Sequence, residues 1–242
     1  MKTPSGANLT AKRVIAVIAS VAVGVVFWDS PLVYPLKLLV VMMHESGHAL
    51  GTLLVGGAVD AISIRPDQSG QCLSLLPPGL FGKVFVYSAG YVGSAIAGGA
   101  LLIATLRFGL RRWVLGAACV WLAVMGLVYA GDPFTWIFCL VTAAAMGLGA
   151  KFLPDGAVDV VNLFIAAFSG LYVVFDVRDD LWNSSVRAMS DAALLAELTY
   201  VPSLLWAALW TVAALGILGL SLWISLRPTR RVRASMSRFV GS

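Results

Sequence analysis

Residues 41–51 read VMMHESGHALG, and they place two histidines and a glutamate inside an apolar run. His44 and His48 are the only 2 histidines in the chain. Residues four apart lie on one face of an α-helix, so both imidazoles can point at a single ion. Glu45 is the next residue round the helix and can reach a water on that ion without binding the ion itself. The pattern predicts a helix on which His44 and His48 bind zinc and Glu45 is the general base.

Composition places this helix in a membrane protein. Of the 242 residues, 60% are hydrophobic and 12% are charged, and the mean hydropathy is +0.90. Soluble domains have roughly 45–50% apolar and about 25% charged residues. The net charge is +5, but the cations cluster at segment ends, which suits lipid headgroups and excludes a nucleic-acid partner. The 3 cysteines are an odd number without CxxC spacing, so neither a disulfide framework nor a thiolate metal site is expected.

Apolar runs of about 20 residues predict transmembrane helices. The fold class expected is an all-α polytopic membrane protein with a bundle of about six to seven such helices. The whole chain, 1–242, is interpreted as one domain with a basic cytoplasmic tail at 227–242. The seven candidate spans are roughly 13–28, 32–55, 84–106, 113–131, 133–150, 157–177 and 200–226.

Lysines and arginines indicate the orientation, because cytoplasmic loops are enriched in them. Seven crossings place the basic residues of 107–112, Lys151 and the C-terminal arginines on one side, so the C-terminus is expected in the cytoplasm and the N-terminus outside. Lys2, Lys12 and Arg13 oppose this arrangement. If the first segment does not cross the membrane, the N-terminus is expected in the cytoplasm. Its cations then lie on the same side as the others, and the conflict disappears.

Residues 56–83 differ from the apolar runs around them. AVDAISIRP alternates apolar and polar residues, and QCLSLLPPG follows the turn signal PDQSG. This pattern predicts a small β-hairpin inserted after the histidine helix, with a connecting loop as the alternative. Polar backbone at membrane depth must be covered by protein or water, so the hairpin is expected at the surface or in a cavity.

Small residues recur at four-residue spacing in the third predicted span. Such surfaces let helix backbones approach closely in lipid. This face could seat the histidine helix, admit an extended substrate or serve generic packing. Its members are Ala89 and Gly93; Gly90, Ser94 and Gly98; and Ala95 and Gly99.

Two other interpretations of the histidine pair remain open. The imidazoles could hydrogen-bond neighbouring helices, or they could hold a metal without catalysis. A charged residue such as Glu45 at bilayer depth costs at least about 2.5–3.5 kcal/mol on insertion scales, which favours a functional site.

Four stretches together resemble the site-2-protease family of intramembrane zinc metallopeptidases, in its peptidase-B-like bacterial and plant branch. They are HESGHALGTLLVGG, YSAGYVGSAIAGGALL, LYVVFDVRDDLW and MSDAALLAELTYVPSLLWAALW, in the family's order. The resemblance implies a multi-pass protein of the bacterial cell membrane that cleaves membrane-embedded segments, with Zn²⁺ as cofactor and a membrane-protein substrate as partner. The alternative is a catalytically inactive scaffold or chaperone-like relative that binds transmembrane segments.

A catalytic zinc usually has three protein ligands, so a third is needed. The resemblance implies an aspartate from a later helix, in a Pro-x-Asp-Gly-like setting that FLPDGA matches at Asp155. Helix rise places His44 about 10 Å in height from Asp176 but about 21 Å from Asp155. Asp176 is therefore the predicted third ligand, with Asp180 second and Asp155 third. Asp179 and Asp191 are interpreted as interfacial, capping or solvated residues, because Ser190-Asp191 before AALLAEL is typical of a helix start.

Overall fold

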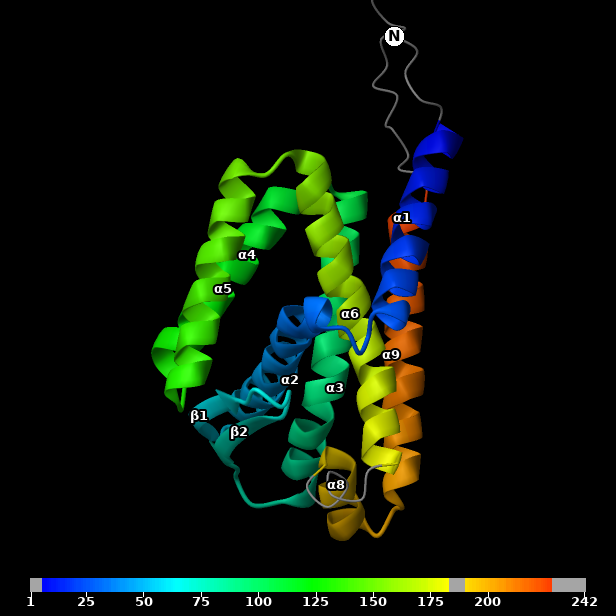
Figure 1. Cartoon of the computed structure of the whole chain (residues 1–242). Coiled ribbons are helices and arrows are strands. Elements are labelled where there is room, and N and C mark those ends of the chain that lie inside the picture. Colours follow the sequence, from blue (N-terminus) through cyan, green and yellow to red (C-terminus); the bar gives the residue numbers. More distant parts are fainter. Residues whose placement is uncertain (1–5, 183–189, 228–242) are drawn as a thin grey trace, which may run out of the picture.

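The computed structural model describes the backbone of residues 6–182 and 190–227, and the side chains of 14–175 and 190–227. It confirms a helical bundle with one two-stranded hairpin (Figure 1). In chain order the elements are α1 (Gly6–Val26), the 3₁₀ turn η1 (Pro31–Val33), α2 (Tyr34–Leu54), β1 (Ala58–Ile64), β2 (Gly70–Leu75), α3 (Leu80–Leu102), the π-helical turn η2 (Ile103–Arg107), α4 (Arg111–Val124), the π-helical turn η3 (Met125–Tyr129), α5 (Pro133–Phe152), α6 (Asp155–Trp182), α8 (Asp191–Thr199) and α9 (Ser203–Leu226).

Five helical segments of the described chain are long and apolar enough to cross a membrane. They are Leu80–Arg107, Arg111–Tyr129, Pro133–Phe152, Asp155–Phe175 and Ser203–Leu226. Each coincides with one of the last five predicted spans. They make the chain a multi-pass membrane protein, with a bundle in which α3, α6 and α9 run side by side.

The first two predicted spans, 13–28 and 32–55, are not among the candidate membrane spans of the described residues. In Figure 1, α1 starts at the top of the bundle, and α2 begins near its middle and ends beside the hairpin. The chain breaks between them, where Trp28 stacks against Phe175 at 4.2 Å and Ser30 caps η1. The described apolar part of α1, Val14–Val26, is shorter than a full span, and α2 contains both histidines and Glu45 within its apolar residues.

The two ends of the described chain lie at the same end of the bundle. The start of α1 and the end of α9 are both at the top in Figure 1, with the α3–α4 and α5–α6 connections. These connections carry Arg107, Arg111, Arg112 and Lys151, and we call this the basic end. The expectation that the N-terminus lies opposite these residues is therefore wrong, and the conflict with the N-terminal cations disappears.

Helix α2 lies at the centre of the bundle, where residues 38–42 are almost completely buried. It crosses α3 through glycines. A Cβ on Gly51 would lie 2.8 Å from the Cβ of Ala89, and a Cβ on Gly93 would lie 3.3 Å from the Cα of Gly47. The small-residue face of α3 thus seats the histidine helix, one of the roles that the sequence suggested.

The predicted hairpin is confirmed. β1 and β2 pair antiparallel, with Ile62 opposite Cys72 and Ile64 opposite Gly70. Ile62 and Ile64 are fully buried, so this face of the hairpin packs into the protein. The outer edge of β1 is covered by the start of α5, because Gly131 N–H donates to the Ile62 carbonyl at 2.8 Å.

Candidate metal centre

The two histidines lie where α2 crosses α3, and both are buried. Their Nε2 atoms are 2.9 Å apart, as the four-residue helical spacing predicts. His48 Nδ1–H donates to the Val86 carbonyl of α3 at 2.7 Å. A carbonyl only accepts, so this bond places the proton of a neutral His48 on Nδ1 and leaves a lone pair on Nε2.

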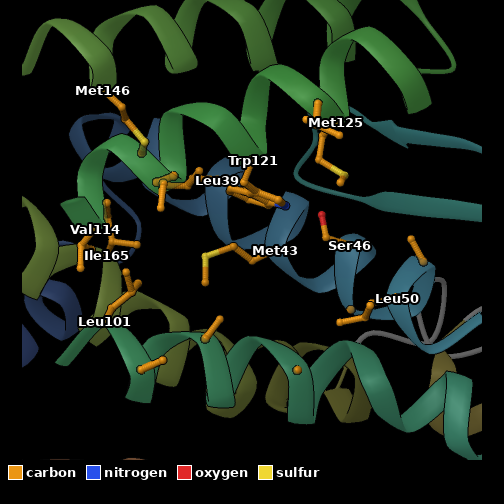
Figure 2. Close-up of a pocket in the computed structure, with 18 of the residues that line it drawn as sticks. Leu39, Met43, Ser46, Leu50, Leu101, Val114, Trp121, Met125, Met146 and Ile165 are labelled. Carbon is orange, nitrogen blue, oxygen red and sulfur yellow. The ribbon is translucent and has the colours of Figure 1, made fainter. Parts of the chain in front are cut away.

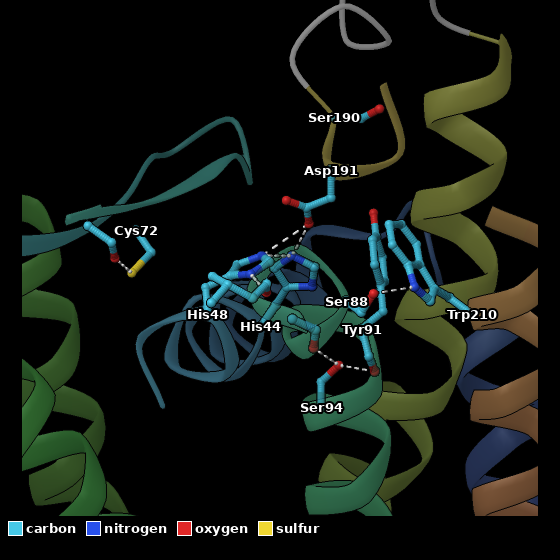
Figure 3. A network of polar contacts seen from close by, with 12 residues as sticks. His44, His48, Cys72, Ser88, Tyr91, Ser94, Ser190, Asp191 and Trp210 are labelled. Carbon is cyan, nitrogen blue, oxygen red and sulfur yellow. Dashed lines mark hydrogen bonds and ion pairs between the residues drawn. The ribbon is translucent and has the colours of Figure 1, made fainter. Parts of the chain in front are cut away.

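Asp191 brings a carboxylate to the same point from a helix far along the chain (Figure 3). Its Oδ2 lies 3.1 Å from His44 Nε2 and 3.0 Å from His48 Nε2. α8 begins at Asp191, and the Ser190 hydroxyl caps it by accepting from the Ala193 N–H at 3.3 Å. The cap and the buried Leu195 and Ala192 fix the direction of α8, so its first residue points at the histidines.

These three atoms form a site that suits a divalent cation. All three are within 4.8 Å of one another, and His44, His48 and Asp191 are the metal-type cluster found among the described residues. Ligands of a tetrahedral zinc with bonds of about 2.0–2.1 Å lie about 3.3 Å apart, which needs only a small outward shift of this triangle. A cation would satisfy the two facing Nε2 atoms and the carboxylate together.

Gly90 of α3 supports this interpretation from the other side. A Cβ at this position would lie 2.5 Å from both His44 Nε2 and His48 Nε2. Only glycine therefore leaves the space in front of the two imidazole nitrogens open. The His44 ring is also packed edge-on against Tyr91, 4.5 Å between centroids, which holds its orientation.

Glu45 is buried beside the histidines but outside the three-residue cluster. A Cβ on Gly70 would contact its carboxylate, so Glu45 lies against the first residue of β2. The metal-type cluster does not include Glu45, and its role as a base stays a prediction. The contact with β2 shows that the hairpin forms one wall of the site.

The electrostatics of the cluster favour an ionised carboxylate. Burial alone would raise the pKa of Asp191, but a protonated His48, in which Nε2 also carries a proton, and the hydrogen bonds from both imidazoles outweigh burial and hold that pKa below its ordinary value. The neighbouring Cys72 behaves differently, since burial raises the pKa of its thiol to about 11. Cys72 stays protonated at neutral pH and is a poor metal ligand there.

The other aspartates considered from the sequence lie elsewhere or are not described. Asp155 is at the basic end, 2.8 Å from Arg112 and 3.0 Å from Arg111, as a turn between α5 and α6 requires. The predicted ligand Asp176 and the alternative Asp180 belong to α6, but their side chains, like that of Asp179, lie outside the described residues, so those predictions stay predictions.

Sequence reasoning missed Asp191. Its interpretation as the start of a helix is confirmed, but its interpretation as a solvated residue is wrong, because its side chain is 15% exposed and faces both histidines. The segment MSDAALLAEL contains a signal for this position. The residues after Asp191 are mostly apolar, and Ala192 and Leu195 are buried, so the first turn of the helix packs against the bundle.

Comparison with known proteins identifies the family of the chain. The search of curated proteins returned no match to the chain, and neither did the search of solved structures. A family model described as Peptidase M50B-like matches residues 17–221, which include α2, the hairpin, α8 and all three members of the cluster. The chain therefore belongs to the Peptidase M50B-like family.

Proposed function

We propose that this protein is a zinc-dependent endopeptidase that hydrolyses peptide bonds in or near transmembrane segments of membrane proteins. The observation that carries the proposal is the convergence of His44, His48 and Asp191, with Glu45 beside them, in a chain of a peptidase family. A structural histidine pair has no need of a glycine, Gly90, that keeps the space in front of both Nε2 atoms open.

His44, His48 and Asp191 would hold the metal. A three-ligand site leaves a fourth position open for water or substrate. Bound zinc lowers the pKa of a coordinated water to about 7 and polarises a carbonyl. The Val86 carbonyl orients His48 for this task, since it holds the Nδ1 proton and aims Nε2 at the cluster.

Glu45 would act as general base and then as general acid. Its carboxylate accepts a proton from the attacking water and later returns a proton to the amine that leaves. Glu45 is placed for both steps because it lies between the cluster and the hairpin, where a substrate strand would enter. Burial of Glu45 keeps competing solvent away from the proton that it carries.

The substrate would bind by adding a strand to β2. The sheet has two strands and β1 is covered by the start of α5, so the free edge in the described chain is that of β2. Along an antiparallel pair of strands, the backbone N–H and C=O groups of opposite residues alternate. In one pair they bond each other, and in the next they point away from the partner strand. The Ile62 carbonyl faces Gly131 and the Ile64 N–H faces Thr135, so their partners Cys72 and Gly70 turn their backbone groups to the free edge. An unwound segment paired there would run past Glu45.

The surroundings of the site suit a substrate held in a membrane. We place the protein in a bacterial cell membrane with the basic end in the cytoplasm, because the cations of the loops gather there. The cluster then lies away from the basic end, because Asp191 begins α8, which lies at the opposite end of the bundle (Figure 1).

The decisive experiment compares the wild type with Glu45→Gln. Both proteins are purified and assayed for zinc and for cleavage of a model single-span substrate. We expect about one zinc per chain in both proteins and cleavage by the wild type alone, because glutamine keeps the size of glutamate but cannot take a proton. Zinc and substrate binding without cleavage in the wild type would favour the scaffold that binds transmembrane segments.

A further inference from the structure

The two histidines of the candidate metal centre are held in different ways. His48 Nδ1–H donates to the Val86 carbonyl at 2.7 Å. His44 Nδ1, in contrast, is buried and has no hydrogen-bond partner among the described residues. A histidine that binds a metal usually donates its second ring N–H to a carbonyl, a carboxylate or water, and this bond fixes the ring. The orientation of the His44 ring therefore has to come from the side chains packed around it.

The rings that pack against His44 come from α3 and α6. On another face, α2 borders an apolar cavity of about 670 Å³ through Met43 and Leu50, and His44 does not line this cavity (Figure 2). The His44 ring lies edge-to-face with Tyr91 of α3, 4.5 Å between centroids, and 5.9 Å from the ring of Tyr172 of α6. Tyr91 is thus the closer of these two aromatic supports.

Tyr91 is in turn held by Trp210 of α9. The two rings stack with centroids 4.9 Å apart and planes 24° apart, and Figure 3 shows Tyr91 between His44 and Trp210. Both side chains are almost completely buried. The indole N–H donates to the Ser88 hydroxyl at 3.1 Å, and Ser88 lies one helical turn before Tyr91 on α3. Trp210 is therefore fixed at both ends, by stacking and by a hydrogen bond.

The orientation of the His44 ring decides where its Nε2 lone pair points. An imidazole nitrogen binds a metal along its lone pair, which lies in the plane of the ring. His44 Nε2 lies 3.1 Å from Asp191 Oδ2 and 2.9 Å from His48 Nε2. A rotation of the His44 ring would turn the lone pair away from the point that the three groups share.

We propose that Trp210 is a positioning residue of the metal centre, which holds the His44 ring in its binding orientation by stacking on Tyr91. The proposal rests on the proposed function, because it takes His44 as a zinc ligand. Trp210 acts through Tyr91 and not by contact with the metal or the substrate.

The first test uses the full-length, metal-free protein, labelled with ¹⁵N and ¹³C at histidine only. The chain has 2 histidines, so NMR spectra contain two sets of ring signals, which are assigned with His44→Ala. In Trp210→Leu, we expect the His44 signals to shift and broaden, because the ring changes its orientation relative to Tyr91. The His48 signals should move much less, because the Val86 carbonyl still holds that ring.

Matched variants separate positioning from a general loss of packing. Trp223→Leu, at an exposed position of the same helix, should leave both histidines unchanged. Trp210→Phe keeps a stacked ring without the N–H, and Ser88→Ala keeps the indole without its acceptor. Both should give smaller changes at His44 than Trp210→Leu. Zinc affinity should follow the same order, with a loss of about tenfold in Trp210→Leu.

The outcomes distinguish this proposal from the proposed function. Wild-type His44 signals in Trp210→Leu, or equal changes at both histidines, would overturn the proposal. If Trp210→Leu fails to fold, Ser88→Ala decides, and unchanged His44 signals in that variant would overturn it. A wild type that binds no zinc would instead refute the proposed function, while the NMR comparison would still show whether Trp210 holds the His44 ring.

Discussion

Asp191 lies 3.1 Å from Nε2 of His44, although 147 positions separate the two residues in the chain. The histidine pair is a local feature of one helix, whereas the four long helices α3, α4, α5 and α6 lie between it and the carboxylate in the chain. The complete metal site is therefore a property of the whole fold, and folding and metal binding should be coupled.

The third ligand can be tested by three aspartate variants measured side by side. Asp191→Ala should lower zinc affinity by more than the 10–100-fold that loss of an outer partner costs, since it removes a ligand. Asp155→Ala should leave zinc almost unchanged, because Asp155 pairs with Arg111 and Arg112 at the other end. Zinc stoichiometry after dialysis against a weak chelator is the measurement.

Asp176→Ala belongs in the same series. Loss of zinc in this variant, with zinc retained in Asp191→Ala, would return the third ligand to the position predicted from helix heights. It would also mean that Asp191 only orients the histidines.

Gly90 provides a test of the space in front of the histidines. Gly90→Ala adds a Cβ 2.5 Å from both Nε2 atoms, so we expect zinc binding and cleavage to fall at least about tenfold. Gly82→Ala is the matched control on α3, because its Cβ meets nothing closer than 3.9 Å. Wild-type zinc content in both variants would show that the metal does not sit between the imidazoles and α3.

Some parts of this arrangement could be predicted from the sequence and others could not. The His44–His48 pair follows from helical periodicity, and the hairpin follows from alternation around a turn. Asp191 could not be found by the height argument, because that argument considered only residues on the long spans. α8 is 9 residues long, too short to be predicted as a span, so its first residue was left out of that argument.

The first two helices show a different limit. Hydropathy identifies apolar segments but not the level at which a chain breaks, and α1 and α2 meet inside the bundle beside Trp28. The edges of the hairpin show a third limit. The sequence does not indicate which edge of the hairpin is open. In the described chain, the link before α5 covers the edge of β1 through Gly131, whereas the edge of β2 is free.

The side of the membrane on which the site lies follows from the basic end. A cysteine at Lys151 should react with a membrane-impermeant maleimide only after cells are opened, whereas a cysteine at Ser69, exposed in the hairpin turn, should react on intact cells. Both variants are compared with the parent protein to subtract its three native cysteines. Reaction of both positions in intact cells, or the reverse pattern, would contradict the orientation.

The free edge of β2 makes the sharpest prediction about substrate binding. Cys72→Pro removes an N–H that faces this edge but leaves the ladder to β1 intact, because Cys72 opposes Ile62, whose carbonyl bonds Gly131. We expect cleavage of a single-span substrate to slow about tenfold, mainly through KM, with zinc content unchanged. Cys72→Val keeps the N–H and removes the same thiol, so it should cleave like wild type. If Cys72→Pro and Cys72→Val cleave equally well, the substrate does not pair with β2, and the unwound segment must be held by side chains of α3 and α8 alone.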